Sequence, residues 1–258
     1  YWTSRPDSIV FSFKVDDIPP NVAILSPEEQ SYERGTTTVH VDAYDGETGI
    51  EKVEFYLNGT LVFTDYDYPY EYMWNTTEYP DGTYMIKIIA YDGVGNVAGH
   101  EVIVIVDNTA PSIGGPTINP ESPTEEDNVS VKVSVTDALS GVEEVILGYS
   151  TDGGATWSNM TMTLGPDGYY MATIPRQPAG TTVLYKIYAL DIAGNQAVSP
   201  EYSYMVRAKP ILIPGYGALI FTTVCLIIII ALVVLWRRRG RESTVMGNRT
   251  KPTIRIAD

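Results

Sequence analysis

An internal repeat of about ninety residues limits the possible folds of this chain more than any other feature of its sequence. Residues 15–20 (VDDIPP) recur as residues 106–111 (VDNTAP), a shift of 91 positions. Later in each unit, residues 90–96 (AYDGVGN) match residues 189–195 (ALDIAGN). The larger second shift indicates extra length in the loops or hairpins of the second unit. Two units of one kind therefore follow each other along most of the chain.

The repeated units have the sequence pattern of β-strands. Apolar residues alternate with polar residues, with a period of two, at Thr38–Ala43 and Val131–Val135. Residues 52–57 run into Asn58 and Gly59, a dipeptide that is typical of tight β-hairpins. Short strands between turn residues, in units of this length, predict an all-β fold made of β-sandwiches.

Each unit closes with one more run that is typical of a strand. The runs are Ile9–Asp16, Glu101–Asp107 and Tyr202–Arg207. Because the first run precedes the first complete unit, we interpret residues 1–16 as the last strand of a preceding domain that is cut short. The expected domains are residues 17–107 and 108–209.

An apolar segment near the C-terminus predicts a single membrane-spanning helix over residues 212–236. The segment has no charged residue and is long enough for a hydrocarbon core of about 30 Å. Tyr216 and Trp236 lie at its two ends, where aromatic rings favour the membrane interface. Arg237, Arg238 and Arg239 follow it, and the positive-inside rule places them in the cytoplasm. We expect a single-pass protein of the cell membrane, in contact with the lipid bilayer, with extracellular N-terminal domains and a basic cytoplasmic tail at residues 237–258.

The distribution of charge along the chain agrees with this orientation. Residues 1–210 contain 10 Lys and Arg but 30 Asp and Glu, a formal charge of −20, whereas residues 211–258 carry +5. Such an acidic outer region argues against nucleic acid as a partner, because phosphate binding needs clustered cations. The single cysteine, Cys225, lies inside the apolar segment, so no disulfide can form within the chain.

Both units resemble known families of surface domains. The first resembles bacterial immunoglobulin-like domains, and the second resembles fibronectin type III or immunoglobulin-like domains. The matching residues of the first are Val53–Tyr56, Asn58, Gly59, Pro69, Tyr70, Trp74–Thr77, Pro80–Tyr84 and Asp92–Asn96, and those of the second are Tyr149–Gly154, Tyr185–Ala189 and Asp191–Asn195. The resemblance implies tandem immunoglobulin-like sandwiches that act as spacers, adhesive modules or appendages of surface enzymes.

The C-terminal segment resembles the anchor and sorting signals of archaeal surface proteins. Residues 213–217 (IPGYG) precede the apolar run, and an arginine cluster follows it. Tyr216 stands where those signals usually carry Phe, and residues 242–258 continue past the point where they usually end. We therefore favour a retained helix over cleavage and lipid attachment.

Two loops of the pattern Asp-x-x-Gly-Asn are candidate calcium sites, because oxygen ligands in tight turns suit this ion. The alternative is that their side chains only cap turns by accepting hydrogen bonds from backbone amides. Asp16, Asp17, Asp45 and Asp137 belong to equivalent positions that could lie nearby. The candidate ligands are Asp92, Asn96, Asp107, Asp191 and Asn195.

An alternation of aromatic residues is the candidate contact surface. Tyr66, Tyr68, Tyr70, Tyr72 and Trp74 would share one face if they lay on a single strand. An exposed strip of this kind could bind surface glycans or proteins. The alternative, which we favour for most of them, is that they cover the core, with the strand interrupted at Pro69. The candidate contact residues are Tyr66, Tyr68 and Tyr72.

Four sequons on the expected outer side are candidate sites of N-glycosylation: Asn58, Asn75, Asn128 and Asn159. Residues 150–157 (STDGGATW) fit the Asp-box of sialidase-like propellers, which occurs here once and is expected to be a structural turn.

Enzyme chemistry has little support in the sequence. The two histidines, His40 and His100, belong to no metalloprotease motif, and no serine-nucleophile elbow is present. We expect a non-catalytic, membrane-anchored stalk or adhesion-type surface protein that presents a more distal region, without a cofactor other than the calcium considered above. The alternatives are an accessory region of a surface hydrolase, a protease or glycosidase whose catalytic domain lies upstream, and a receptor that signals through the tail.

Overall fold

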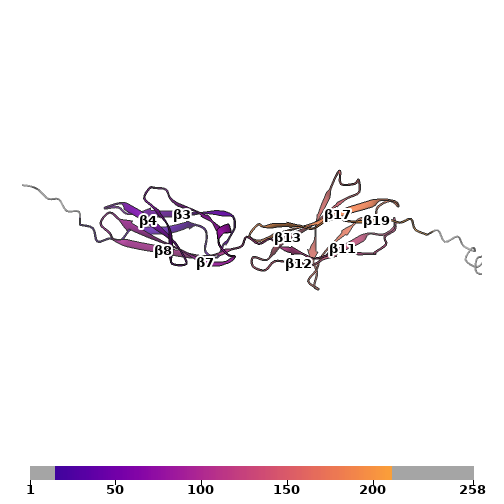
Figure 1. The fold of residues 1–258 in the computed structure, drawn as a ribbon, viewed down its shortest axis with the longest axis horizontal. Coiled ribbons are helices and arrows are strands. Elements are labelled where there is room, and N and C mark those ends of the chain that lie inside the picture. Colours follow the sequence, from indigo (N-terminus) through magenta and orange to yellow (C-terminus); the bar gives the residue numbers. More distant parts are fainter. Residues whose placement is uncertain (1–14, 211–258) are drawn as a thin grey trace, which may run out of the picture. The chain divides into compact units, whose positions relative to one another are not determined.

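The computed structural model describes residues 15–210, which form two consecutive β-sandwiches (Figure 1). Each sandwich has its own apolar core. The predicted all-β fold is therefore confirmed. Within residues 15–210 no helix has the length and hydropathy needed to cross a bilayer. The apolar segment 212–236 and its flanking residues Tyr216, Trp236 and Arg237–Arg239 lie outside the described residues, as do residues 1–14.

The first sandwich packs a three-stranded sheet against a five-stranded sheet. The smaller sheet has the order β1 (Asn21–Ser26), β3 (Thr36–Tyr44), β6 (Tyr70–Asn75). The larger sheet has the order β2 (Tyr32–Glu33), β8 (Val97–Val106), β7 (Gly82–Asp92), β4 (Ile50–Leu57), β5 (Thr60–Asp65). One 3-10 turn, η1 (Thr76–Glu78), follows β6.

Alternating side chains of these strands build the first core. Val39 and Val41 of β3 point inward, and Trp74 of β6 is fully buried between the two sheets. The rings of Tyr79 and Tyr84 pack edge-on against Trp74, with centroids 5.7 and 5.5 Å away. Aromatic residues of this size contribute much of the apolar area that a small sandwich can bury.

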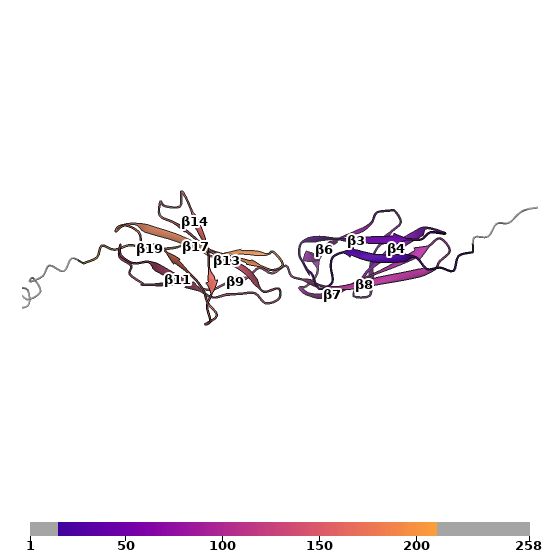
Figure 2. The ribbon, with the colours of Figure 1, turned by 180° about the vertical axis from the view of Figure 1, so that it is seen from behind.

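The second sandwich has the same two-layer arrangement (Figure 2). One sheet has the order β10 (Thr117–Asn119), β11 (Val129–Val133), β16 (Tyr170–Ile174), β15 (Thr163–Leu164). The other has the order β14 (Ser158–Thr161), β13 (Val142–Ser150), β17 (Thr182–Asp191), β18 (Gln196–Val198), with β19 (Tyr202–Met205) also paired to β17. A short pair, β9 (Ser112–Ile113) and β12 (Val135–Thr136), completes the domain.

The single strand predicted at Val131–Val135 is divided in two in the structure. β11 ends at Val133 and pairs with β10 and β16, whereas β12 begins at Val135 and pairs with β9. Between them, the carbonyl of Ser134 accepts a hydrogen bond of 2.8 Å from the amide of Gly114. The alternating pattern survives the change of partner strand, which explains why the sequence predicts one continuous strand.

The predicted hairpin at Asn58 and Gly59 is confirmed. Both residues have positive φ, 48° and 81°, and they join the antiparallel pair β4 and β5. Glycine adopts this conformation without a steric penalty, and asparagine tolerates it better than most residues. The run Glu101–Asp107 is the end of the longer strand β8, and Tyr202–Arg207 contains β19.

Candidate functional site

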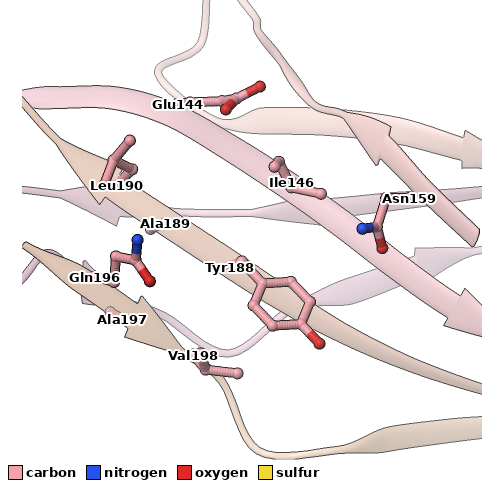
Figure 3. Close-up of a pocket in the computed structure, with 9 residues that line it drawn as sticks. All are labelled: Glu144, Ile146, Asn159, Tyr188, Ala189, Leu190, Gln196, Ala197 and Val198. Carbon is pink, nitrogen blue, oxygen red and sulfur yellow. The ribbon is translucent and has the colours of Figure 1, made fainter. Parts of the chain in front are cut away.

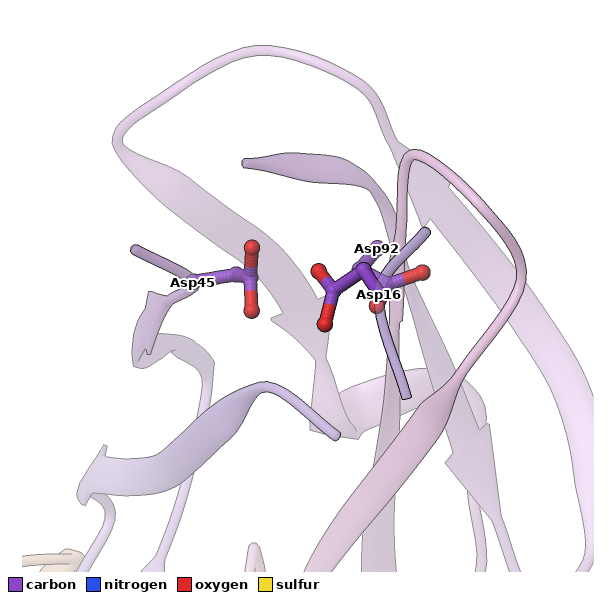
Figure 4. Close-up of side chains that lie close together, drawn as sticks. All are labelled: Asp16, Asp45 and Asp92. Carbon is purple, nitrogen blue, oxygen red and sulfur yellow. The ribbon is translucent and has the colours of Figure 1, made fainter. Parts of the chain in front are cut away.

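Two equivalent clusters of carboxylates lie at corresponding ends of the two sandwiches. In the first, Asp16, Asp45 and Asp92 each place a carboxylate oxygen within 4.8 Å of the others (Figure 4). In the second, the cluster consists of Asp107, Asp137 and Asp191. The sequence repeat therefore brings the same three acidic positions together twice.

Hydrogen bonds hold each carboxylate of the first cluster. Oδ1 of the buried Asp92 accepts from the amides of Val94, Gly95 and Asn96 at 2.7–3.0 Å. Oδ2 accepts from Nδ2 of Asn96 at 2.7 Å. Burial by itself raises the pKa of Asp92, but these hydrogen bonds outweigh it and keep the pKa below its ordinary value. The amide of Thr48 has the largest effect in lowering the pKa of Asp45.

The second cluster is held in the same way. Nδ2 of Asn195 donates to Oδ2 of Asp191 at 2.9 Å, and the amide of Asn195 donates to Oδ1 of Asp191 at 2.7 Å. Oδ2 of Asp107 accepts from the amide of Ser140 at 3.0 Å. Asp107, Asp191 and Asn195 are all buried. The interior of this loop region is therefore polar and fully hydrogen-bonded at these carboxylates, as buried charges require.

Asn96 and Asn195 turn their amide nitrogens toward the carboxylate clusters. Their Nδ2 atoms face carboxylates and backbone carbonyls, which are all acceptors, so the orientation of each amide is fixed by its partners. A calcium ligand would have to turn an oxygen toward the cluster. Both asparagines are hydrogen-bond donors here. Calcium binding by Asp92, Asn96, Asp107, Asp191 and Asn195 stays a prediction.

The same asparagines fasten the segment that enters each sandwich. Nδ2 of Asn96 donates to the carbonyl of Asp16 at 3.1 Å, and Nδ2 of Asn195 donates to the carbonyl of Asp107 at 2.9 Å. Sequence reasoning placed these residues at a candidate site but missed this role. A signal was available, because the Asp-x-x-Gly-Asn loop and the aspartate of the linker recur together at every repeat.

The linker between the sandwiches is also hydrogen-bonded by the first domain. The amide of Asp107 donates to the carbonyl of Glu33, and Oδ1 of Asn108 accepts from the amide of Gly35, both at 2.9 Å. Asp81 accepts from the amide of Asn108 at 2.9 Å and from the hydroxyl of Thr109 at 2.5 Å. Residues 107–109 thus have hydrogen-bond partners from both domains.

The aromatic alternation does not form one exposed strip. Tyr70 and Trp74 point into the core from β6, and Tyr72 is half-buried and stacks on Phe63, with ring centroids 5.6 Å apart. Tyr66 and Tyr68 precede the strand and lie in the loop between β5 and β6, with 64% and 77% of their surface exposed. The three predicted contact residues therefore do not share one face. Ligand contact by Tyr66, Tyr68 and Tyr72 stays a prediction.

The four sequon asparagines differ in how their side chains are engaged. Oδ1 of Asn58 accepts from the amide of Met85, and Oδ1 of Asn128 accepts from the amide of Arg176. Nδ2 of Asn75, the atom that glycosylation would modify, donates to Glu78 at 2.9 Å. Asn159 is exposed on β14. Glycosylation of these four residues stays a prediction.

The Asp-box is a structural turn, as predicted. Asp152 accepts hydrogen bonds from the amide and hydroxyl of Thr156 at 2.9 and 2.6 Å, and from the hydroxyl of Ser150 at 2.7 Å. These bonds lower the pKa of Asp152 to about 2, with the Thr156 hydroxyl contributing most. Trp157 closes the turn by donating from Nε1 to the carbonyl of Gly154.

A groove on the outer face of the second sandwich was not predicted from the sequence. It has a volume of about 280 Å³ and crosses strands β13, β17 and β18, with Asn159 of β14 at its edge (Figure 3). Ile146, Tyr188 and Val198 lie side by side across these strands, because the register pairs Ile146 with Tyr188 and Tyr188 with Val198. The single available signal was the presence of large apolar residues at outward-facing strand positions.

The described part of the chain is a tandem pair of β-sandwiches joined by a hydrogen-bonded linker. Residues 20–88, within the first sandwich, match the family model of the bacterial Ig domain. No curated protein sequence matches the chain.

Several solved structures have a similar fold at low sequence identity. The fibronectin(III)-like modules of Clostridium thermocellum CbhA are 17% identical, with 73% of this chain and 94% of that chain covered and a TM-score of 0.43. The FN1–FN3 domains of chicken CNTN1 are 16% identical, with 73% and 66% covered and a TM-score of 0.45. The endo-beta-1,4-mannanase from Thermotoga petrophila is 18% identical, with a TM-score of 0.32. The match covers 36% of this chain and 21% of the enzyme chain.

Proposed function

We propose that this chain is the membrane-proximal, non-catalytic stalk of an adhesion-type surface protein. The two sandwiches stand outside the cell and hold a more distal region away from the bilayer. Residues 212–236 anchor them as one membrane-spanning helix, and the basic tail lies in the cytoplasm. The observation that carries this proposal is the linker at residues 107–109, which is hydrogen-bonded by both domains.

A stalk must resist bending where its domains join, and the linker has the contacts that such resistance requires. A flexible linker is rich in Gly and Ser and leaves its backbone to water. Here Pro111 follows the hydrogen-bonded residues 107–109. The backbone groups of Asp107 and Asn108 have protein hydrogen-bond partners from folded loops. Each hydrogen bond restricts the dihedral angles of the linker, so bending requires breaking several of them together.

The anchor proposal depends on the transfer of an uncharged segment into lipid. Every apolar side chain of residues 212–236 favours the hydrocarbon, and a helix satisfies all backbone groups of the segment internally. The four arginines Arg237, Arg238, Arg239 and Arg241 oppose translocation of the following tail. The acidic charge of the preceding region agrees with its position on the outer side.

Membrane extraction tests the anchor. The full chain and a variant that lacks residues 212–236 are produced in the same cells, and membranes are washed with alkaline carbonate and then with detergent. We expect the full chain to stay in the pellet after carbonate and to be released by detergent, whereas the deletion variant is recovered without detergent. Release of the full chain by carbonate alone would contradict the proposed anchor.

A further inference from the structure

We propose that the groove on the outer face of the sheet β14–β13–β17–β18 binds a neutral oligosaccharide. Its volume of about 280 Å³ is close to the lower end of the roughly 300–1,000 Å³ that is usual for ligand pockets. This size suits one or two sugar rings of a longer chain. The inference goes beyond the stalk function and is independent of the membrane anchor.

The floor of the groove is apolar and aromatic. Tyr188 of β17 lies between Ile146 of β13 and Val198 of β18, and Leu190 extends the floor along β17 (Figure 3). An aromatic ring presents a flat apolar face to which the C–H groups of a sugar ring can pack. The apolar floor therefore offers a surface for one face of a sugar ring.

A glycine keeps this part of the sheet open. A Cβ atom at Gly148 would lie 3.0 Å from Oδ1 of Asn159, 3.0 Å from Cε2 of Tyr188 and 3.6 Å from Cε3 of Trp157. Any other residue at position 148 would therefore displace the rings and the amide that border the groove. Glycine at this position leaves room for the ring of Tyr188.

Polar groups of both hydrogen-bonding types surround the floor. The side-chain amides of Asn159 and Gln196 each offer a donor and an acceptor, and Glu144 offers a carboxylate. Within residues 15–210, the side chains of Asn159 and Gln196 have no protein hydrogen-bond partner, and Glu144 accepts only from the hydroxyl of Thr161 at 3.3 Å. Sugar hydroxyls donate and accept at the same time, so such a mixed rim is complementary to them.

The equivalent face of the first sandwich shows that this arrangement is not a general property of the fold. There, Glu54 occupies the place of Ile146, and Ile89 occupies the place of Tyr188. Glu54 accepts from Lys52 at 2.5 Å and from the hydroxyls of Tyr56 and Tyr91 at 2.6 and 3.0 Å. These bonds engage the carboxylate of Glu54, and the groove that Ile89 lines on that face has Lys87 and Glu101 at its border and no tyrosine in its lining. The second sandwich has a tyrosine in its groove and leaves the polar groups around it available.

Charge selects among the possible ligands. Glu144 lies at the groove, and residues 1–210 carry a formal charge of −20, so anionic ligands are repelled. Apart from the carboxylate of Glu144, the polar groups of the groove are uncharged. The groove therefore offers a cationic ligand only one opposite charge. A neutral glycan matches the floor, the rim and the charge together.

Calorimetric titration of the full chain in lipid nanodiscs tests the proposal. The protein is produced in a host without N-glycosylation, so that Asn159 carries no glycan of its own. The probes are cellohexaose, mannohexaose, laminarihexaose and the hexamer of N-acetylglucosamine. We expect at least one of them to bind, and Tyr188→Ala to weaken that binding about tenfold.

Two further variants separate loss of the site from loss of the fold. Gln196→Ala changes an exposed side chain on a short edge strand and should weaken binding about fivefold without changing thermal unfolding. Ile89→Ala, at the place on the first sandwich that corresponds to Tyr188, is the matched control and should leave binding unchanged.

Three results would overturn the proposal. The first is the absence of binding for all four oligosaccharides up to a concentration of about 5 mM, which is in the range of weak single-site affinities. The second is binding that is unchanged in Tyr188→Ala and Gln196→Ala but lost in Tyr68→Ala, which would place the glycan on the exposed loop of the first sandwich. The third is binding of an arginine-rich peptide in place of the sugars.

Discussion

Asn96 and Asn195 make equivalent hydrogen bonds in the two sandwiches, but they differ in burial. Asn195 is buried and donates to Asp191 and to the carbonyl of Asp107, whereas Asn96 is half-buried in its own loop. Removal of a buried donor leaves its acceptors without a partner and without water. The same substitution should therefore cost more in the second sandwich than in the first.

We predict that Asn195→Ala lowers the free energy of unfolding of the second sandwich by about 1–3 kcal/mol. Asn96→Ala is the matched control and should lower the free energy of unfolding of the first sandwich by less, because water can reach its acceptors. Urea denaturation followed by hydrogen exchange of each domain measures both values. A larger loss for Asn96→Ala than for Asn195→Ala would contradict this explanation.

Asp152 gives the second sandwich a dependence on acid pH. Its pKa is lowered from 3.8 to about 2 by hydrogen bonds from Thr156 and Ser150. The stabilisation is therefore fully present above the unfolded pKa near 3.8 and is lost as the pH falls through the folded pKa near 2. We predict that Asp152→Asn removes part of the decrease in stability between about pH 4 and pH 2.

Unfolding of wild type and Asp152→Asn at a series of pH values measures this effect. The difference in stability between the two proteins should be constant above about pH 5 and should shrink below pH 4. Asp67→Asn, an exposed change in the first sandwich, controls for the loss of one negative charge. A difference that stays constant down to pH 2 would show that the turn does not stabilise the charged carboxylate.

At the scale of elements, the turn between β4 and β5 depends on a left-handed backbone. Gly59 has a φ of 81°, and no atom outside its neighbours lies within 4 Å of a Cβ placed there, so conformational strain is the main cost of a side chain. We predict that Gly59→Ala destabilises the first sandwich by about 1–2 kcal/mol. Thermal or urea unfolding measures the change.

Gly115→Ala is the matched control for this turn. A Cβ at Gly115 also meets no atom within 4 Å, but its φ is not positive. The change should therefore be neutral or slightly stabilising, since alanine restricts the unfolded chain. Equal losses of stability in the two variants would mean that the sign of φ does not explain the role of Gly59.

Strands and turns could be predicted where the signal is local to one segment. The hairpin at Asn58 and Gly59 depends on its own two residues, and the alternation of Thr38–Ala43 depends on one strand. The change of partner at Ser134 depends on Gly114, twenty positions earlier, and no local pattern reveals it. The aromatic alternation in the sequence begins at Tyr66, but β6 begins only at Tyr70. Tyr66 and Tyr68 therefore lie in the preceding loop, which the alternation alone does not reveal.

The outer-sheet groove could not be predicted for the same reason. Its floor joins Ile146, Tyr188 and Val198, which come from three strands, and their proximity depends on the register between those strands. The carboxylate clusters could be predicted in part. The repeat marked their positions, but the direction of each asparagine amide depends on partners that only the folded loops provide.

The whole molecule contains two separate apolar cores, joined by the hydrogen-bonded linker at residues 107–109. An uncharged apolar segment follows them in the sequence. This order suits a chain that displays folded modules on a surface. In the proposed arrangement, the acidic charge of residues 1–210 would repel other anionic polymers. The proposed stalk function depends on the position of the sandwiches relative to the membrane.

Cysteine labelling in intact cells measures this position. Cys225 is first replaced by serine, and a single cysteine is then placed at the exposed Tyr68 or in the tail at Ser243. With a membrane-impermeant maleimide, we predict that Tyr68→Cys is labelled in intact cells and that Ser243→Cys is labelled only after permeabilisation. Labelling of Ser243→Cys in intact cells, or of Tyr68→Cys only after permeabilisation, would contradict the proposed orientation.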